Sequence, residues 1–135
     1  MMKILLKGLI IMIIFSLTAC GAAEDNATEP AEITYEQISA EEAKALMDTE
    51  EDYVIIDART YDEYKEGHIP GAILIPEYEI ADRAEDELPH KDQLILVYCR
   101  SGRRSKIASA ELVKLGYTNV KEVGGIIDWT YEIVK

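Results

Sequence analysis

Basic residues and cysteine are both scarce in this chain, and each shortage excludes a class of protein. The 135 residues include 14 lysines and arginines against 26 aspartates and glutamates, which gives a formal net charge of −12. Such a charge repels the phosphates of nucleic acids and of anionic lipids, so we expect no nucleic-acid partner. The two cysteines, Cys20 and Cys99, permit at most one disulfide. Apolar residues make up 48% of the chain, which is enough for the core of one domain.

The first twenty residues have the layout of a targeting signal rather than of a folded element. Two lysines precede an apolar run, residues 9–17, that is short for a membrane span. The run ends in the sequence LTAC at residues 17–20, which resembles the bacterial lipoprotein signal. The resemblance implies removal of residues 1–19, lipidation of Cys20 and a location in the cell envelope, anchored to a membrane and facing outside the cytoplasm. The alternative is an ordinary signal peptide or membrane anchor with an incidental cysteine.

Lipidation of Cys20 would leave Cys99 as the only free thiol of the mature protein. A lone exported thiol is exposed to oxidation, which indicates that this thiol is used for chemistry. Residues 20–32 are small, polar and acidic, and we interpret them as the lipidated N-terminus and a flexible tether. The remaining residues, 33–135, are predicted to form one domain.

Strand-like and helix-like segments alternate along this domain. Strands are predicted at residues 53–58, 72–76, 93–99 and 119–123, with helices at 42–48, 59–67, 77–88 and 103–116. Capping boxes, Ser39 with Glu42 and Thr60 with Glu63, mark the starts of the first two helices. The alternation predicts an α/β fold with a central parallel β-sheet of about five strands, flanked by helices on both faces.

Three chemically active side chains follow the ends of predicted strands. Cys99 ends the most apolar strand, and Asp57 and Arg59 end the strand at residues 53–58. Ligands of open parallel sheets bind beyond the carboxyl ends of the strands, so these side chains are expected at one site. We expect Asp57 to support that site, either by bonding loop N–H groups or by pairing with Arg59.

The stretch VYCRSGRRS, residues 97–105, gathers positive charges around one thiol in an acidic chain. The strand is expected to end at Cys99 and a helix to begin near Arg103, and consecutive N–H groups in the turn between them can form an anion-binding nest. The helix N-terminus and the arginines favour a thiolate, so we expect Cys99 to have a low pKa and to act as a nucleophile. The residues predicted to bind an anionic substrate are Arg100, Ser101, Gly102, Arg103 and Arg104.

Four motifs make the domain resemble the rhodanese family, as a single-domain sulfurtransferase. They are IIDART at 55–60, EYKEGHIPGAILIP at 63–76, VYCRSGRRS at 97–105 and GGIIDW at 124–129. The resemblance implies a rhodanese-like fold and transfer of a sulfane sulfur from thiosulfate, or a similar small anionic donor, to cyanide or a thiol. Cys99 would carry the sulfur as a persulfide, with no metal and no organic cofactor.

Two other functions fit a cysteine in an anion-binding loop. Cysteine-based phosphatases and arsenate reductases need an arginine six positions after the cysteine, where this chain has Ser105. A non-catalytic module that binds a partner or senses sulfide is the second alternative, since a fold alone does not guarantee an activity. His68 is expected to be structural, His90 to lie at the surface and Trp129 to belong to the core.

Overall fold

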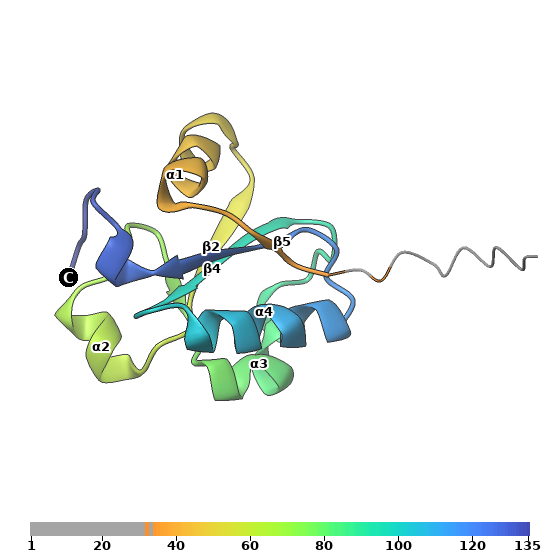
Figure 1. The fold of residues 1–135 in the computed structure, drawn as a ribbon. Coiled ribbons are helices and arrows are strands. Elements are labelled where there is room, and N and C mark those ends of the chain that lie inside the picture. Colours follow the sequence, from red (N-terminus) through yellow and green to blue (C-terminus); the bar gives the residue numbers. More distant parts are fainter. Residues whose placement is uncertain (1–31, 33) are drawn as a thin grey trace, which may run out of the picture. The chain divides into compact units, whose positions relative to one another are not determined.

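The computed structural model describes residue 32 and residues 34–135, which form one domain around a five-stranded parallel sheet (Figure 1). The strands are β1 (Glu36–Gln37), β2 (Tyr53–Asp57), β3 (Ile73–Leu74), β4 (Leu94–Cys99) and β5 (Val120–Gly125). Their order in the sheet is β1-β5-β4-β2-β3, and every neighbouring pair is parallel. The predicted parallel sheet of about five strands is confirmed.

Helices cover both faces of the sheet, as predicted. They are α1 (Ala40–Thr49), α2 (Tyr61–Glu66), α3 (Ile80–Glu87) and α4 (Arg103–Lys114), with short 3₁₀ turns at η1 (Glu77–Glu79) and η2 (Ile126–Asp128). Figure 1 shows α3 and α4 together on one side of the sheet and α1 on the other. Both predicted capping boxes are present, at the starts of α1 and α2.

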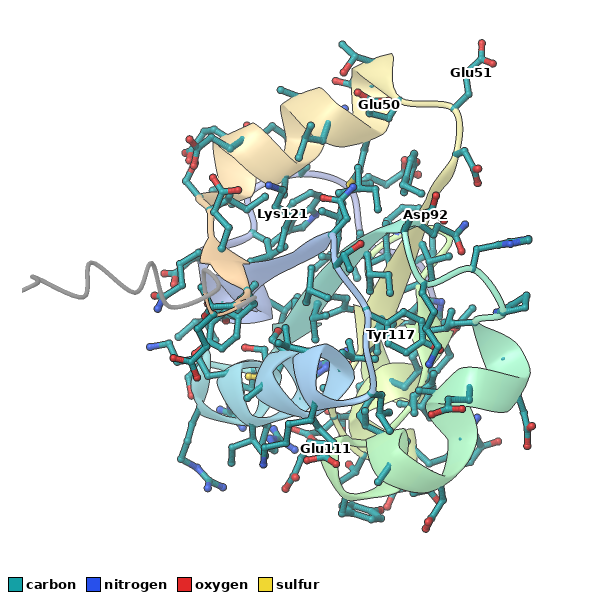
Figure 2. The ribbon with its side chains drawn as sticks, turned by 90° about the vertical axis from the view of Figure 1, so that its right-hand side faces the viewer. Glu50, Glu51, Asp92, Glu111, Tyr117 and Lys121 are labelled. Carbon is teal, nitrogen blue, oxygen red and sulfur yellow. The ribbon has the colours of Figure 1, made fainter. Side chains whose placement is uncertain are left out.

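The core has one half on each face, because neighbouring residues of a strand point to opposite faces. Ile56 and Val97 pack on the side of α3 and α4, whereas Ile55 and Leu96 pack on the other side. Tyr117, labelled in Figure 2, follows α4, and its hydroxyl lies 2.6 Å from the carbonyl oxygen of Leu88 at the end of α3. Burial on both faces explains why the central strands are apolar without alternation.

The structure corrects three details of the sequence-based assignment. β1 was not located, because an edge strand of two exposed residues carries no apolar pattern. The spacing of the apolar residues in the helix at 103–116 would place Ile107 on the buried face, but Ile107 is 44% exposed. The buried face is formed by Ser105, Ala108, Ser109 and Leu112. The strand predicted at residues 119–123 does not end there, because β5 continues through Gly125.

The predictions for the signal segment, for Cys20 and for nearly all of the tether lie outside the described residues. Within the described part of the chain, no helix is both long and apolar enough to span a bilayer.

Candidate active site

Cys99 is the last residue of β4, and its side chain is 1% exposed. The chain turns through residues 100–102 and enters α4 at Arg103. Gly102, the residue before α4, has φ 106° and ψ −15°, a left-handed conformation that glycine adopts without the strain of a side chain. In this turn the Gly102 N–H donates to the Cys99 Sγ at 3.0 Å. The structure thus places the thiol inside the loop, next to the N-terminus of α4.

Two opposing effects act on the pKa of the Cys99 thiol. Burial is the larger single effect and raises the pKa, because a buried thiolate is poorly solvated. Hydrogen bonds from the Ser105 side chain and from the amides of Ser105, Gly102 and Ser101 favour the thiolate, and together they bring the pKa below its ordinary value. The loop therefore favours the nucleophilic form of the sulfur.

The end of β5 packs directly against the loop. Gly125 pairs with Cys99 in the sheet, and a Cβ atom at Gly125 would lie 2.1 Å from the Arg100 carbonyl oxygen and 2.6 Å from the Ser101 Cα. Only glycine permits so close an approach of two backbones. Just beyond it, the Ile127 N–H donates to the Arg100 carbonyl oxygen at 3.3 Å. The segment at residues 124–129 therefore supports one side of the loop.

The three arginines that were predicted to bind an anion have different surroundings in the structure. Arg100 and Arg103 are exposed, and neither forms an ion pair with another described residue. Arg104 instead donates two hydrogen bonds, at 2.7 and 2.8 Å, to the Glu63 carboxylate of α2. These hydrogen bonds are the largest cause that lowers the pKa of Glu63, to about 2. The positive charges of Arg100 and Arg103 are thus not neutralised by any described side chain, whereas the charge of Arg104 is paired with Glu63 and connects α4 to α2.

Asp57 is the last residue of β2, which neighbours β4, and Arg59 lies two residues further along the chain. Both residues are buried, and the Arg59 guanidinium donates to the Asp57 carboxylate at 2.7 and 2.9 Å. The Tyr98 hydroxyl also donates to Asp57, at 2.7 Å. Asp57 therefore pairs with the Arg59 side chain, and it also accepts a hydrogen bond from the Arg59 backbone N–H at 3.0 Å. Among the described residues, the Asp57 carboxylate accepts no hydrogen bond from the amides of residues 100–102.

Sequence reasoning missed two residues beside the sulfur, Ser105 and Glu122. The Ser105 Oγ lies 3.4 Å from the Cys99 Sγ and 2.5 Å from a Glu122 carboxylate oxygen. Ser105 was considered only as the position where a phosphatase has its arginine. The signal for Glu122 is present in the sequence, because strand alternation places it on the same face as the buried Val120.

The residues expected to be structural occupy structural positions. The His68 ring stacks on Tyr64 with ring centroids 3.7 Å apart, and its Nδ1 lies 2.9 Å from the Tyr64 carbonyl oxygen. Trp129 is buried in the core on the side of α1, and His90 is exposed.

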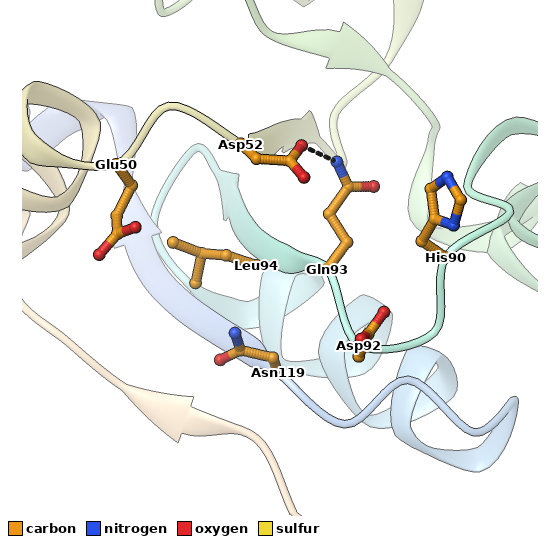
Figure 3. A pocket seen from close by; sticks show the side chains of 7 residues that line it. All are labelled: Glu50, Asp52, His90, Asp92, Gln93, Leu94 and Asn119. Atoms are coloured by element: carbon orange, nitrogen blue, oxygen red, sulfur yellow. Dashed lines mark hydrogen bonds between the residues drawn. The ribbon is translucent and has the colours of Figure 1, made fainter.

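A separate hollow lies at the opposite end of β4 from Cys99 (Figure 3). The residues that line it are Glu50, Asp52, His90, Asp92, Gln93, Leu94 and Asn119. Three carboxylates make this hollow a poor match for an anionic substrate. The groups suited to an anion therefore lie at the carboxyl end of β4, and not here.

Comparison with known proteins agrees with this geometry. Residues 39–132 match the rhodanese-like domain family. Thiosulfate sulfurtransferase PspE of Escherichia coli K12 is 39% identical over 80 residues, which cover 59% of this chain and 77% of that protein. A sulfurtransferase of Allochromatium vinosum is 43% identical over 88 residues, which cover 64% of this chain and 79% of that protein. The chain spans only half the length of a Bacillus subtilis relative that is 40% identical over 95 residues.

Solved structures show the same fold. A rhodanese with anions from E. coli has a TM-score of 0.59 at 37% identity, over 62% of this chain and 98% of that one. A thiosulfate sulfurtransferase from Pseudomonas aeruginosa has a TM-score of 0.68 at 33% identity, over 74% of this chain and 20% of that one. With the family match, the strand order and the cysteine loop in agreement, the chain belongs to the rhodanese-like domain family.

Proposed function

We propose that the protein is a sulfurtransferase that moves a sulfane sulfur from thiosulfate, or a similar anionic donor, to a thiophilic acceptor. The observation that carries the proposal is the position of the Cys99 sulfur, 3.0 Å from the Gly102 amide, in a loop flanked by the exposed Arg100 and Arg103. The names of two relatives, both sulfurtransferases, support the same class of reaction.

The proposed reaction has two halves, with a persulfide on Cys99 between them. In the first half, the Cys99 thiolate attacks the outer sulfur of thiosulfate, the sulfur–sulfur bond of thiosulfate breaks, and sulfite leaves with its electron pair. Cys99 then carries an anionic persulfide. In the second half, cyanide or a thiol attacks the outer sulfur, and the electron pair of the broken bond returns to Cys99 as a thiolate.

The loop supplies electrostatic stabilisation in both halves. The Gly102 N–H and the N-terminus of α4 face the sulfur, so they favour the thiolate and then the persulfide anion. Arg100 and Arg103 are free to attract a dianionic donor, which the acidic remainder of the chain would otherwise repel.

The mass of the intact protein tests this proposal. The purified full-length chain is incubated with thiosulfate, beside a Cys99→Ser variant treated in the same way. A gain of one sulfur atom that requires Cys99 is the expected result. Addition of cyanide should then remove the sulfur and release thiocyanate.

An absence of any mass gain, with the Cys99 thiol shown to be reduced, would contradict sulfur transfer from thiosulfate. Hydrolysis of an aryl phosphate by the same sample would then favour the phosphatase alternative. Inactivity in both assays and with a polysulfide donor would favour a binding or sensing module.

We also propose, from residues 1–20 alone, that Cys20 carries lipid and holds the domain in the cell envelope, outside the cytoplasm. The Cys20→Ala variant should then move from the membrane fraction to the soluble fraction when the full-length chain is expressed in bacteria. Continued membrane binding of that variant would place the anchor elsewhere.

A further inference from the structure

A carboxylate is buried beneath the active-site loop. Glu122 of β5 is 2% exposed, and its side chain accepts hydrogen bonds from the Gly124 N–H at 2.9 Å and from the Ser105 hydroxyl at 2.5 Å. In the part of the chain that the structure describes, no lysine, arginine or histidine forms an ion pair with it. A buried carboxylate without a cation is costly unless it shares a proton, so this position calls for an explanation.

Ser105 lies between Glu122 and the reactive sulfur. Its hydroxyl is fully buried, 2.5 Å from the Glu122 oxygen and 3.4 Å from the Cys99 Sγ. A hydroxyl donates one proton and accepts others. Ser105 can therefore accept from the Cys99 thiol while it donates to the Glu122 carboxylate. It can equally donate to a Cys99 thiolate while it accepts from a protonated Glu122. The geometry suits both arrangements, which differ by the position of one proton.

We propose that Cys99, Ser105 and Glu122 share a single proton and a single negative charge, so that Glu122 is a positioning residue for the nucleophile. The inference rests on the function proposed above. When the thiol ionises, its S–H bond breaks and its proton passes to the Ser105 oxygen. The original Ser105 proton moves to the Glu122 carboxylate, and the electron pair stays on sulfur. No proton is gained or lost, and the buried site holds one negative charge before and after.

The reason for sharing is electrostatic. Through Ser105, the Cys99 sulfur and the Glu122 oxygen lie at most about 6 Å apart, a separation at which a like charge disfavours ionisation of its neighbour. Two negative charges so close in a buried site repel each other strongly. The amides that face Cys99 favour the thiolate, so we place the shared charge mainly on sulfur and the proton on Glu122.

The neighbouring elements add few groups that titrate near neutral pH. The other charged or titratable side chains on the elements packed around Glu122 are Tyr35 and Glu36 at β1, Tyr98 on β4, Arg103, Arg104, Lys106, Glu111 and Lys114 on α4, and Lys121 on β5. The arginines, lysines and tyrosines ordinarily titrate above neutral pH. Glu36 pairs with Lys121 and Glu111 with Lys114, and neither of these glutamates bonds to Ser105.

The pH dependence of Cys99 alkylation tests the proposal. The full-length chain is treated with iodoacetamide from about pH 4 to about pH 10, and modification of the peptide that carries Cys99 is followed by mass spectrometry. Two coupled groups lose their protons in two separate steps, so the wild-type rate should rise twice, with the steps at least about one pH unit apart. Glu122→Gln should give a single step, because the amide cannot ionise. Glu36→Gln, a matched change at the surface, should keep both steps.

A single step of the same midpoint in the wild type and in Glu122→Gln would overturn the proposal. If Glu122→Gln does not fold, infrared spectroscopy decides instead. The wild type at neutral pH should show the stretching band of a protonated carboxyl group, and Cys99→Ser should lack it, because serine cannot hold the charge. A band that persists in Cys99→Ser would also contradict the proposal. Alkylation needs no sulfur donor, so these results are independent of whether thiosulfate loads the enzyme.

Discussion

Two glycines shape the surroundings of the Cys99 sulfur. Gly102 supplies the left-handed turn that brings an N–H group to the thiol, and Gly125 supplies the empty space into which the loop backbone fits. The first requirement is conformational and the second is steric. A side chain at position 125 would therefore move the loop, even though the backbone φ of −117° at Gly125 is accessible to any residue.

Gly125→Ala is predicted to slow persulfide formation more than about 100-fold, because a misplaced loop loses the geometry on which catalysis depends. The new Cβ would lie 2.1 Å from the Arg100 carbonyl oxygen, and the resulting overpacking should lower the free energy of unfolding by about 1–3 kcal/mol. The control is Gly71→Ala, at a φ of +80° with no atom within 4 Å of the added Cβ. That variant should lose some stability through backbone strain but keep its activity. Full activity in Gly125→Ala would show that the loop tolerates displacement.

The Tyr98 hydroxyl connects two buried polar groups on the other face of the sheet. It donates to the Asp57 carboxylate and accepts from the Ile69 N–H at 3.1 Å. Tyr98→Phe removes the hydroxyl that bonds the Asp57 carboxylate and the Ile69 N–H. We therefore predict that the free energy of unfolding, measured in urea, falls by about 1–3 kcal/mol, with little change in turnover. The exposed Tyr78→Phe should change stability by less than about 0.5 kcal/mol. Lost turnover at unchanged stability would instead assign the Asp57 network to the active site.

At the scale of elements, one ion pair connects α2 to α4 across 41 residues of sequence. The pKa of Glu63 is about 2 in the folded protein, below its ordinary value of 4.5. A lowered pKa means that the stabilisation is fully present above pH 4.5 and is lost as the pH falls towards 2. The Glu63–Arg104 pair is therefore expected to stabilise the contact between α2 and α4 at neutral pH and to lose that contribution in acid.

Glu63→Gln tests this link, because glutamine can keep the capping-box hydrogen bond while it removes the charge. The free energy of unfolding at pH 6 should fall by about 1 kcal/mol, and the difference from the wild type should shrink towards pH 2. Asp48→Asn, which breaks a more exposed ion pair with Lys44, should show a smaller difference. A difference in Glu63→Gln that does not depend on pH would attribute the effect to packing.

Variants of the same ion pair test whether Arg104 contacts the sulfur donor. Arg104→Ala removes a positive charge and is predicted to raise the KM for thiosulfate by about threefold to tenfold, which corresponds to at most about 1.4 kcal/mol. Glu63→Gln leaves that charge unpaired, so it should lower the KM instead. Steady-state kinetics of the two variants give the answer. An equal rise of the KM in both would mean that Arg104 acts only by holding α2 in place.

At the scale of the whole molecule, the sequence specified the topology better than it specified the contacts. The apolar runs and capping boxes located four of the five strands and all four α-helices in the described part of the chain, because these signals are local. The parallel sheet followed from their alternation. The Glu63–Arg104 pair and the Ser105–Glu122 bond join residues 41 and 17 positions apart, and no local pattern predicts which side chains meet across such distances. The strand β1 was not predicted from the sequence, because its pairing with β5, and not its own composition, makes it a strand.

The distribution of charge along the sheet also has a functional consequence. Glu50, Asp52 and Asp92 gather at the amino end of β4, and Figure 2 shows Glu50 and Asp92 on that part of the surface. Arg100 and Arg103 follow the carboxyl end. Because β4 has six residues, its two ends lie about 20 Å apart, which is about two Debye lengths at 0.1 M salt. The carboxylates at the amino end are therefore largely screened from Cys99. The potential at Cys99 is therefore expected to be set by the nearby arginines, although the chain as a whole carries −12.

Paired alkylation rates measure this local potential. Iodoacetate is an anion and iodoacetamide is neutral, so the ratio of their rates at Cys99 reports the field that an anionic donor meets. At low salt the ratio should exceed that of a small free thiol, and it should fall towards the free-thiol value at 1 M salt, where the Debye length is about 3 Å. A double variant, Arg100→Gln with Arg103→Gln, should lower the ratio at low salt, because it removes two of the positive charges near Cys99 from an otherwise acidic chain. A ratio already below the free-thiol value in the wild type would mean that the net charge of the molecule outweighs the loop.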